Sequence, residues 1–272
     1  MGVNPTPLPA PDGFVHDDRK ERMTIAQLFS HSSGLSFQPH VNRRHELPSI
    51  QAAVNQIYFN VPMDYEPGTF VQYAGVGMQI VGGISEIVMQ QSWIEIFLEQ
   101  LAIPLGMTST DYFGYINEEV VTNNPNVAGS IRTNIDDYMR FLYMIYGNGT
   151  YNDERVLSVE AVRSITQSYS EGLTVLRSPF EPYYLEAPET MQLKTGLGNW
   201  LYVDEYNNPR YVVSAGAWGC MPFIDYERNL IGVYMPFKLD VENDPVKQLS
   251  TNPSTTVFLR DLKPILDQIF TD

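Results

Sequence analysis

Cysteine, basic residues and long apolar runs are all scarce in this chain of 272 residues. Its single cysteine, Cys220, excludes an internal disulfide and leaves the redox compartment open. The 17 basic and 32 acidic side chains give a formal net charge of −15. Such a surface repels phosphate backbones and anionic lipids, so we expect no nucleic-acid partner. No apolar run approaches the roughly 20 residues that span a bilayer, so we expect no membrane span.

The start of the chain lacks the features of a secretory signal. The segment MGVNPTPLPAPDG has neither a basic region nor an apolar core. Its prolines predict an extended lead-in over residues 1–22. We therefore expect a soluble chain with no signal peptide in this sequence, and its cellular compartment stays open.

Spacings typical of a metal site are missing too. The four histidines are His16, His31, His40 and His45, and none shows ligand spacing with carboxylates or cysteines. We therefore expect no metal and no cofactor. The acidic pair at 136–137 is interpreted as the N-terminus of a helix, where the helix dipole favours negative charge.

The first part of the chain is predicted to be mainly helical. Apolar residues at helical spacing predict helices at residues 23–31, 50–59, about 74–89, 92–104 and 134–146. Ser92 and Glu95 form a capping box at the start of the fourth helix, and Pro104 is expected to end it.

The last part is predicted to be rich in strands. Short β-rich runs separated by turns lie at residues 199–206, 210–214, 219–225 and 230–235, and an amphipathic helix is expected from about Thr255. This order predicts an α+β fold in one domain over residues 1–272. Within it we expect the lead-in at 1–22, a mainly helical part at 23–190, and antiparallel strands with the C-terminal helix at 191–272.

Five sequence blocks follow one another along most of the chain. They are LFSHSSGL at 28–35, PGT at 67–69 with Tyr73-Ala74, VGM at 76–78, PLGMTST at 104–110, and GAWGC with IDYERNLIGV at 216–233. In this order the chain resembles the serine β-lactamases, DD-peptidases and related esterases. The resemblance implies an antiparallel sheet flanked by helices with a helical subdomain. It also implies ester or amide hydrolysis through an acyl-serine, in a family whose members are often periplasmic or secreted.

Tyr73 matches the second motif of that family, in which a tyrosine passes protons to the leaving group. Gly75 stands two residues later, where true β-lactamases carry asparagine, and this resembles the esterase-like branch. Apart from the resemblance, Tyr73 also fits an aromatic residue packed at the start of a helix.

The third motif of the family is KTG, HxG or WGG on an edge strand that lines the substrate cleft. Ser214, Ala215 and Gly216 match its position, and the resemblance makes Ala217 the donor of an oxyanion-hole N–H. Because Ser214 replaces the usual Lys, His or Trp, we do not expect binding of a β-lactam carboxylate. The same residues also fit an ordinary strand end. The literal Lys-Thr-Gly at 194–196 lies one hairpin too early and is interpreted as a decoy.

The Ser-x-x-Lys nucleophile motif of the family occurs nowhere in the 272 residues. In the family its serine and lysine share one helix face, so that lysine can act as the base. Ser32 and Ser33 at a helix end, Ser85 in mid-helix and Cys220 in a strand are poor substitutes. The N-terminal part of the domain is therefore expected to be missing.

Two functions stay open, with a takeover by another serine as a weaker third. The first is a serine hydrolase of esterase or amidase type whose nucleophile segment is lost by truncation or supplied by a complementing chain. It predicts a small ester or amide substrate, a cleft shared by Tyr73 and residues 214–217, and a homodimer through an uncovered apolar face. The second is a catalytically inactive binding or scaffold protein of the same fold. In both, the chain alone is expected to hydrolyse little.

Overall fold

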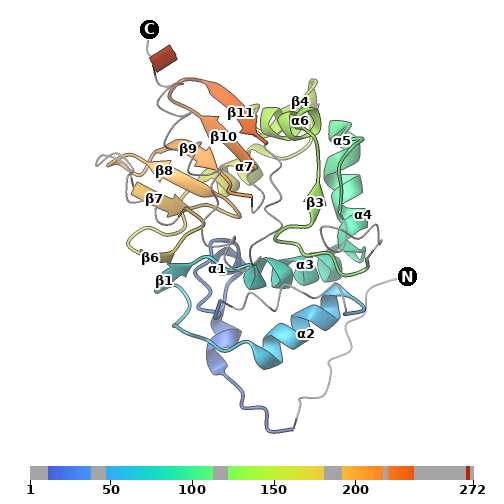
Figure 1. Ribbon diagram of the computed structural model, residues 1–272, viewed down its shortest axis with the longest axis vertical. Helices are drawn as coiled ribbons and strands as arrows, with labels where there is room; N and C mark the ends of the chain where they lie inside the picture. The colour runs from blue at the N-terminus through green and yellow to red at the C-terminus, as the bar shows by residue number, and fades with distance from the viewer. Residues whose placement is uncertain are drawn as a thin grey trace, which may run out of the picture. The chain divides into compact units, whose positions relative to one another are not determined.

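The computed structural model describes residues 12–37, 47–112, 122–180, 192–216, 220–235 and 268–269. The chain divides into two compact units: unit 1 holds residues 1–137 and 172–174, and unit 2 holds residues 138–171 and 175–272. Helices α1 to α5 belong to unit 1 and the sheet β7 to β11 belongs to unit 2 (Figure 1). The predicted α+β class is confirmed.

Unit 1 is mainly helical, and several of its helices pack around an apolar cluster. Its helices are the 3₁₀ helix η1 (Asp18–Arg22), α1 (Ile25–Phe29), α2 (Ile50–Asn60), α3 (Val76–Met89), α4 (Trp93–Phe97), the π-helical turn η4 (Leu98–Ala102) and α5 (Ile103–Leu105). The core cluster contains Leu28, Leu35, Ile57, Val61, Met63, Ala74, Val76 and Val81. It therefore joins α1, α2 and α3 to the loops that precede and follow them.

Local capping sets where several of these helices begin. The Thr24 hydroxyl accepts from the backbone N–H of Gln27 while the Gln27 side chain accepts from the Thr24 N–H, a reciprocal capping box. Ser92 and Glu95 form the second capping box, as predicted from the sequence. Ser49 caps α2 through the N–H of Ala52.

The prediction that Pro104 ends its helix was wrong. The chain stays helical through Pro104 to Leu105 and leaves the helix at Gly106, whose φ is 65°. The π turn η4 comes directly before this position, and a widened turn changes which carbonyl each N–H reaches. It lets the helix pass a residue that has no N–H to donate.

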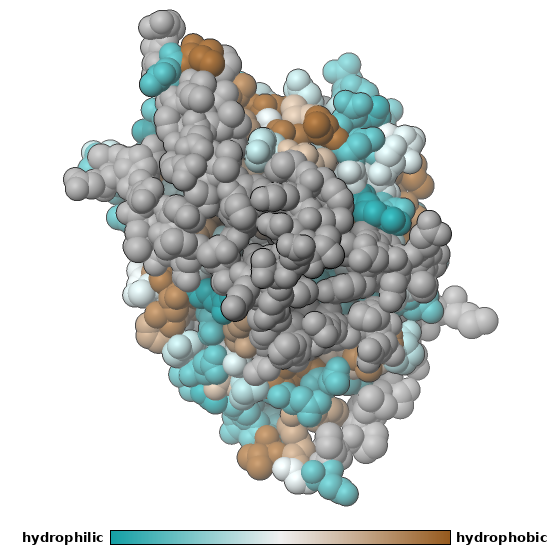
Figure 2. Space-filling view, in the orientation of Figure 1, coloured by the Kyte–Doolittle hydropathy of each residue, from teal (hydrophilic) through white to brown (hydrophobic). Residues whose placement is uncertain are grey.

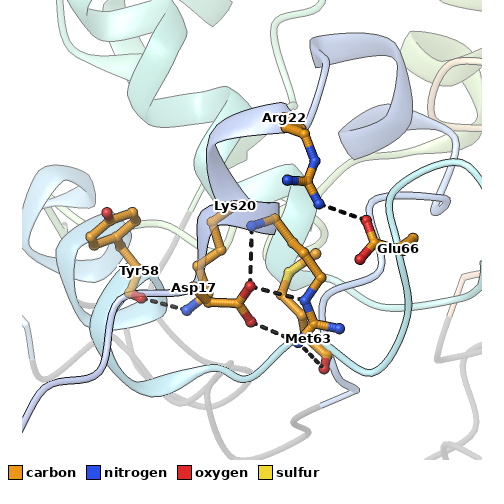
Figure 3. A network of polar contacts seen from close by, with 7 residues as sticks. Asp17, Lys20, Arg22, Tyr58, Met63 and Glu66 are labelled. Atoms are coloured by element: carbon orange, nitrogen blue, oxygen red, sulfur yellow. Dashed lines mark hydrogen bonds and ion pairs between the residues drawn. The ribbon is translucent and has the colours of Figure 1, made fainter.

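Residues 18–22, part of the predicted extended lead-in, form η1 instead, and polar contacts tie this helix to unit 1 (Figure 3). The Asp17 carboxylate caps η1 and accepts from the Arg19 guanidinium at 2.7 Å, and this hydrogen bond holds the pKa of Asp17 at about 2. Arg19 also donates to the Met63 carbonyl at 3.1 Å. Lys20 donates to the Tyr58 carbonyl at 2.5 Å, and burial lowers its pKa. These contacts anchor η1 against α2 and the loop that follows it.

Unit 2 contains an antiparallel sheet of five strands in the order β11-β10-β9-β8-β7. The strands are β7 (Gln192–Thr195), β8 (Trp200–Val203), β9 (Pro209–Val213), β10 (Met221–Asp225) and β11 (Leu230–Tyr234). Each strand pairs with its neighbour in sequence, so the predicted meander is confirmed. Every residue of β8 and β10 is buried, so both faces of the sheet are covered along these two strands.

The remaining described elements are two helices and several short strands. They are β1 (Phe70–Gln72), β2 (Asp111–Tyr112), β3 (Ile131–Arg132), α6 (Ile135–Tyr146), β4 (Thr150–Tyr151), β5 (Glu154–Arg155), α7 (Val159–Thr166) and β6 (Thr174–Arg177). The sequence predicted α6 but missed α7, which Ser158 caps through the N–H of Ala161. The helix expected from about Thr255 lies outside the described residues, apart from 268–269.

Exposed apolar side chains occur on several elements, among them Val88 on α3 and Ile103 on α5, which are 73% and 70% exposed. On the face shown in Figure 2, the coloured apolar residues lie in separate groups among polar ones. Among the described helices, none is both long enough and apolar enough to cross a bilayer.

Candidate active site

Tyr73 lies where a tight turn leads into α3. Gly68 adopts a φ of 81°, and the Thr69 hydroxyl closes the turn by donating to the Glu66 carbonyl at 2.7 Å. Strand β1 follows, and Tyr73 comes one residue after its end, half-buried. Gly75 is the N-cap residue of α3 and makes no side-chain capping bond. The predicted packing of Tyr73 just before a long helix is confirmed, while its role stays a prediction.

The segment after α1 and the loop that carries Tyr73 are joined by backbone hydrogen bonds. The Gly68 N–H donates to the Ser32 carbonyl at 2.8 Å, and the Asp64 N–H donates to the Gly34 carbonyl at 2.8 Å. Gly34 has a φ of 82°, and a Cβ there would lie 2.3 Å from the Tyr65 carbonyl oxygen. Only glycine fits this position, so the SGL block and the PGT block fold as one piece.

His31 lies directly against Tyr73, a contact that sequence reasoning missed. The two rings meet edge to face, with centroids 4.9 Å apart and an interplanar angle of 70°. His31 Nδ1 is 3.1 Å from the Ala74 carbonyl oxygen, and the His31 carbonyl accepts from the Gln72 N–H at 2.8 Å. Burial disfavours the imidazolium and lowers the pKa of His31 to about 4, so the ring is neutral at pH 7. The signal was present, since His31 stands inside the HSSGL block, but nothing in the sequence shows that this block meets Tyr73.

The candidate serine side chains all make hydrogen bonds within the fold. Ser30 and Ser32 are both 1% exposed, and their hydroxyl oxygens are 2.9 Å apart. The Ser33 hydroxyl accepts from the Leu35 N–H at 3.4 Å. Ser85 donates to the Val81 carbonyl one helical turn earlier. These contacts support the interpretation of Ser32, Ser33 and Ser85 as poor substitutes for the nucleophile.

Ser214, Ala215 and Gly216 follow β9 in unit 2, and Ala217 lies outside the described residues. The Ser214 N–H donates to the Pro222 carbonyl at 3.3 Å, and the Gly216 N–H donates to the Cys220 carbonyl at 2.7 Å. The expected edge-strand position was wrong for this sheet as described, because β9 pairs with β8 on one side and with β10 on the other. The segment instead begins the connection between β9 and β10.

The literal Lys-Thr-Gly sequence ends the edge strand β7. Thr195 is fully buried, its N–H donates to the Ser170 hydroxyl at 2.8 Å, and its carbonyl accepts from the Tyr169 N–H at 2.8 Å. Because the backbone of Thr195 is already paired on its outer side, it offers no hydrogen bonds to a substrate there. This supports the interpretation of residues 194–196 as a decoy.

Cys220 is a partly buried thiol beside the β9–β10 connection. Burial raises its pKa to about 11, which keeps it protonated at neutral pH. Within the described ranges, no group of three or more His, Cys, Asp or Glu side chains is arranged to hold a metal ion. Tyr73 belongs to unit 1 and Ser214 to unit 2, so a shared cleft remains a prediction.

Comparisons with known proteins add the family context. The sequence family described as Beta-lactamase matches residues 7–247. The lovastatin esterase of Penicillium rubens is 25% identical over 264 residues, which cover 80% of this chain and 65% of that enzyme. The chain thus spans less than two thirds of the length of this relative.

Solved structures show the same fold. A protein of Bacteroides dorei DSM 17855 described as a candidate β-lactamase superposes with a TM-score of 0.72 at 26% identity, over 89% of this chain and 72% of that one. The simvastatin synthase of Aspergillus terreus superposes with a TM-score of 0.56 at 18% identity, over 89% and 66% respectively. The predicted fold of β-lactamases and DD-peptidases is therefore confirmed.

Proposed function

The chain belongs to the β-lactamase family, and from this we propose that it carries the proton-transfer tyrosine and the cleft segment of a serine hydrolase that cleaves small esters. The observation that carries the proposal is the contact between His31 and Tyr73, whose rings are 4.9 Å apart. This contact joins the HSSGL block to the PGT block at the tyrosine that would transfer the proton, and the two residues lie 42 positions apart in sequence. The nucleophilic serine and its lysine would come from outside these 272 residues.

In the proposed reaction, the serine oxygen adds to the carbonyl carbon of the ester and its proton passes to the lysine. Tyr73 then gives its hydroxyl proton to the departing alkoxide as the carbon–oxygen bond breaks, which leaves an acyl-serine. Water then attacks the acyl-serine and gives its proton to the Tyr73 phenolate. The serine oxygen leaves as it takes its proton back from the lysine, which releases the acid and restores all three side chains. The N–H of Ala217 would stabilise the oxyanion in both halves of the reaction.

Two substitutions favour an ester over a β-lactam as the substrate. Gly75 removes the amide side chain, and Ser214 removes the cation or ring that the family places at these positions. A site without that cation lacks a partner for the carboxylate of a β-lactam. The similarity to a lovastatin esterase agrees with this preference.

The test compares two forms of the protein. Sequencing the genomic DNA upstream of Met1 shows whether the reading frame continues, and the extended chain and the 272-residue chain are then both treated with a fluorophosphonate probe. We expect the extended chain to be labelled on one serine and to hydrolyse p-nitrophenyl butyrate, and the shorter chain to do neither. Tyr73→Phe in the extended chain should lower kcat about 10²- to 10⁴-fold. Tyr143→Phe is the matched control, since Tyr143 is 54% exposed on α6.

The absence of Ser-x-x-Lys also favours a second function, a binding protein that keeps the fold without the chemistry. This alternative predicts no upstream Ser-x-x-Lys and no labelled serine in any form. Equal kcat in Tyr73→Phe and in the unsubstituted extended chain would also reject the hydrolase assignment of Tyr73.

A further inference from the structure

One residue, His31, contacts three successive residues of the Tyr73 loop. Its carbonyl accepts from the Gln72 N–H at 2.8 Å, its ring meets the Tyr73 ring edge to face, and its Nδ1 lies 3.1 Å from the Ala74 carbonyl oxygen. His31 thus contacts the ring of Tyr73 and the backbone on both sides of Tyr73.

The conformation of His31 makes this arrangement specific. His31 adopts a φ of 57°, a left-handed conformation that few side chains other than glycine, asparagine, aspartate and histidine enter readily. This bend ends the path of α1 and turns both the carbonyl and the ring of His31 toward residues 72–74. Because a carbonyl oxygen can only accept, Nδ1 carries the proton in the hydrogen bond to Ala74. His31 is 7% exposed and its ring is neutral, so it packs without a buried charge.

Other buried polar side chains of unit 1 serve different connections. Glu86 accepts from the Trp93 N–H at 3.0 Å and from Gln51 at 3.2 Å, and so links α3 to α4 and α2. Gln79 accepts from the Val127 N–H at 3.0 Å and fixes a loop instead. Neither makes a contact of this kind with the loop that carries Tyr73.

We propose that His31 is the positioning residue of Tyr73, fixing the direction of the phenol through its ring contact and through its hydrogen bonds to the backbone of residues 72 and 74. The proposal rests on the proton-transfer role given to Tyr73 above. A tyrosine that must reach a leaving group within hydrogen-bond distance loses rate steeply when it is misplaced by about 1 Å. The edge-to-face contact itself favours one ring orientation by about 2- to 13-fold.

His31→Asn separates the ring contact from the hydrogen bonds. Asparagine tolerates the left-handed φ, and its side-chain amide can donate to the Ala74 carbonyl as Nδ1 does, but it has no ring to meet Tyr73. The matched control is His16→Asn. His16 also lies beside a tyrosine, with Nδ1 3.1 Å from the Tyr58 hydroxyl, but it is exposed and distant in sequence from the Tyr73 loop.

The first measurement needs no catalysis and uses the 272-residue chain. The chain is labelled with ¹³C at the tyrosine ring ε positions, and the Tyr73 signal is identified by its loss in Tyr73→Phe. We expect a high order parameter for the Tyr73 ring in the unsubstituted chain and in His16→Asn, and a clearly lower one in His31→Asn. An unchanged order parameter in a folded His31→Asn chain overturns the proposal.

The second measurement is a double-mutant cycle on the extended, active chain with p-nitrophenyl butyrate. His31→Asn should lower kcat about 10- to 100-fold with KM nearly unchanged, and it should have almost no further effect when Tyr73 is already phenylalanine. A merely structural histidine would lower kcat equally in both backgrounds, which would refute positioning. If His31→Asn does not fold, His31→Gly replaces it in both measurements, since glycine adopts the left-handed φ without strain and lacks both the ring and the Ala74 bond. It should free the Tyr73 ring and lower kcat only while Tyr73 is present, and a rigid Tyr73 ring in folded His31→Gly overturns the proposal.

The two measurements also separate this proposal from the hydrolase proposal. If the extended chain has no esterase activity but the Tyr73 ring is freed in His31→Asn, the proposed function fails and the hold of His31 on Tyr73 stands. If activity is present and the double-mutant cycle shows additive effects, the hydrolase stands and positioning by His31 fails.

Discussion

A Cβ on Gly77 would lie 2.7 Å from the carbonyl oxygen of Leu28, so α3 can pack on the last turn of α1 only because residue 77 is glycine. Both helices lead to the candidate site, since α1 ends just before His31 and α3 begins just after Tyr73. The glycine therefore sets how closely the two site segments approach each other.

Gly77→Ala is expected to destabilise the chain. Alanine gains up to about 1 kcal/mol of helix propensity, but the overlap with a backbone carbonyl that cannot rotate away costs about 1–3 kcal/mol more than that gain. Urea unfolding measures the difference. Gly129→Ala is the control, because its Cβ would meet only the Asn126 side chain at 3.4 Å. Equal stability of the two variants would show that α1 and α3 do not pack as described.

The PLGMTST block is held by one buried acceptor, the carboxylate of Asp137. The Asp137 carboxylate is 3% exposed and accepts from the Ser109 N–H at 2.7 Å and from the Thr110 hydroxyl at 2.8 Å. Asp137→Ala leaves both donors without that partner and should lower the free energy of unfolding by about 1–3 kcal/mol. Asp136→Ala removes the exposed neighbouring acid and should change it by less than about 0.5 kcal/mol. Similar losses in both variants would instead indicate an effect of the α6 dipole alone.

Some features of the fold and the candidate site could be predicted from the sequence and others could not, for physical reasons. The Ser92–Glu95 capping box and the strands of the sheet were predictable because each depends on residues close together in sequence. The contact between His31 and Tyr73 was not, because it depends on the glycine turns at 34 and 68 bringing two distant segments together. The prediction at Pro104 was wrong because proline usually ends a helix, and the pattern of apolar residues does not reveal the π turn that precedes it here.

The buried His31 predicts a pH dependence of stability. Its pKa is about 4 in the folded chain and about 6.5 when exposed, so the unfolded chain binds the extra proton between these pH values. The free energy of unfolding therefore falls as the pH is lowered from about 7 to about 4, by about 3 kcal/mol from this group, and His31 adds no further change below that.

Urea titrations of the unsubstituted chain and of His31→Asn at pH 7.5, 6.0, 5.0 and 4.5 test this expectation. Carboxylates that titrate in the same window are common to both chains, so the difference between the two isolates His31. That difference should shrink steadily toward acid pH. A constant difference would mean that the His31 ring is not held neutral in the folded chain.

The last prediction concerns Cys220, the only thiol of the chain. A pKa of about 11, raised by burial, leaves far less thiolate at pH 8 than an exposed cysteine has. A thiol of higher pKa is intrinsically the better nucleophile, which offsets part of this loss, so alkylation by iodoacetamide should be roughly 10- to 100-fold slower than that of free cysteine. Mass spectrometry follows the modified chain with time, with the chain unfolded in urea as the reactive control. A native rate equal to the unfolded rate would place Cys220 in open solvent. A faster rate would give it the activated character of a nucleophile, against its interpretation as a poor substitute for the missing serine.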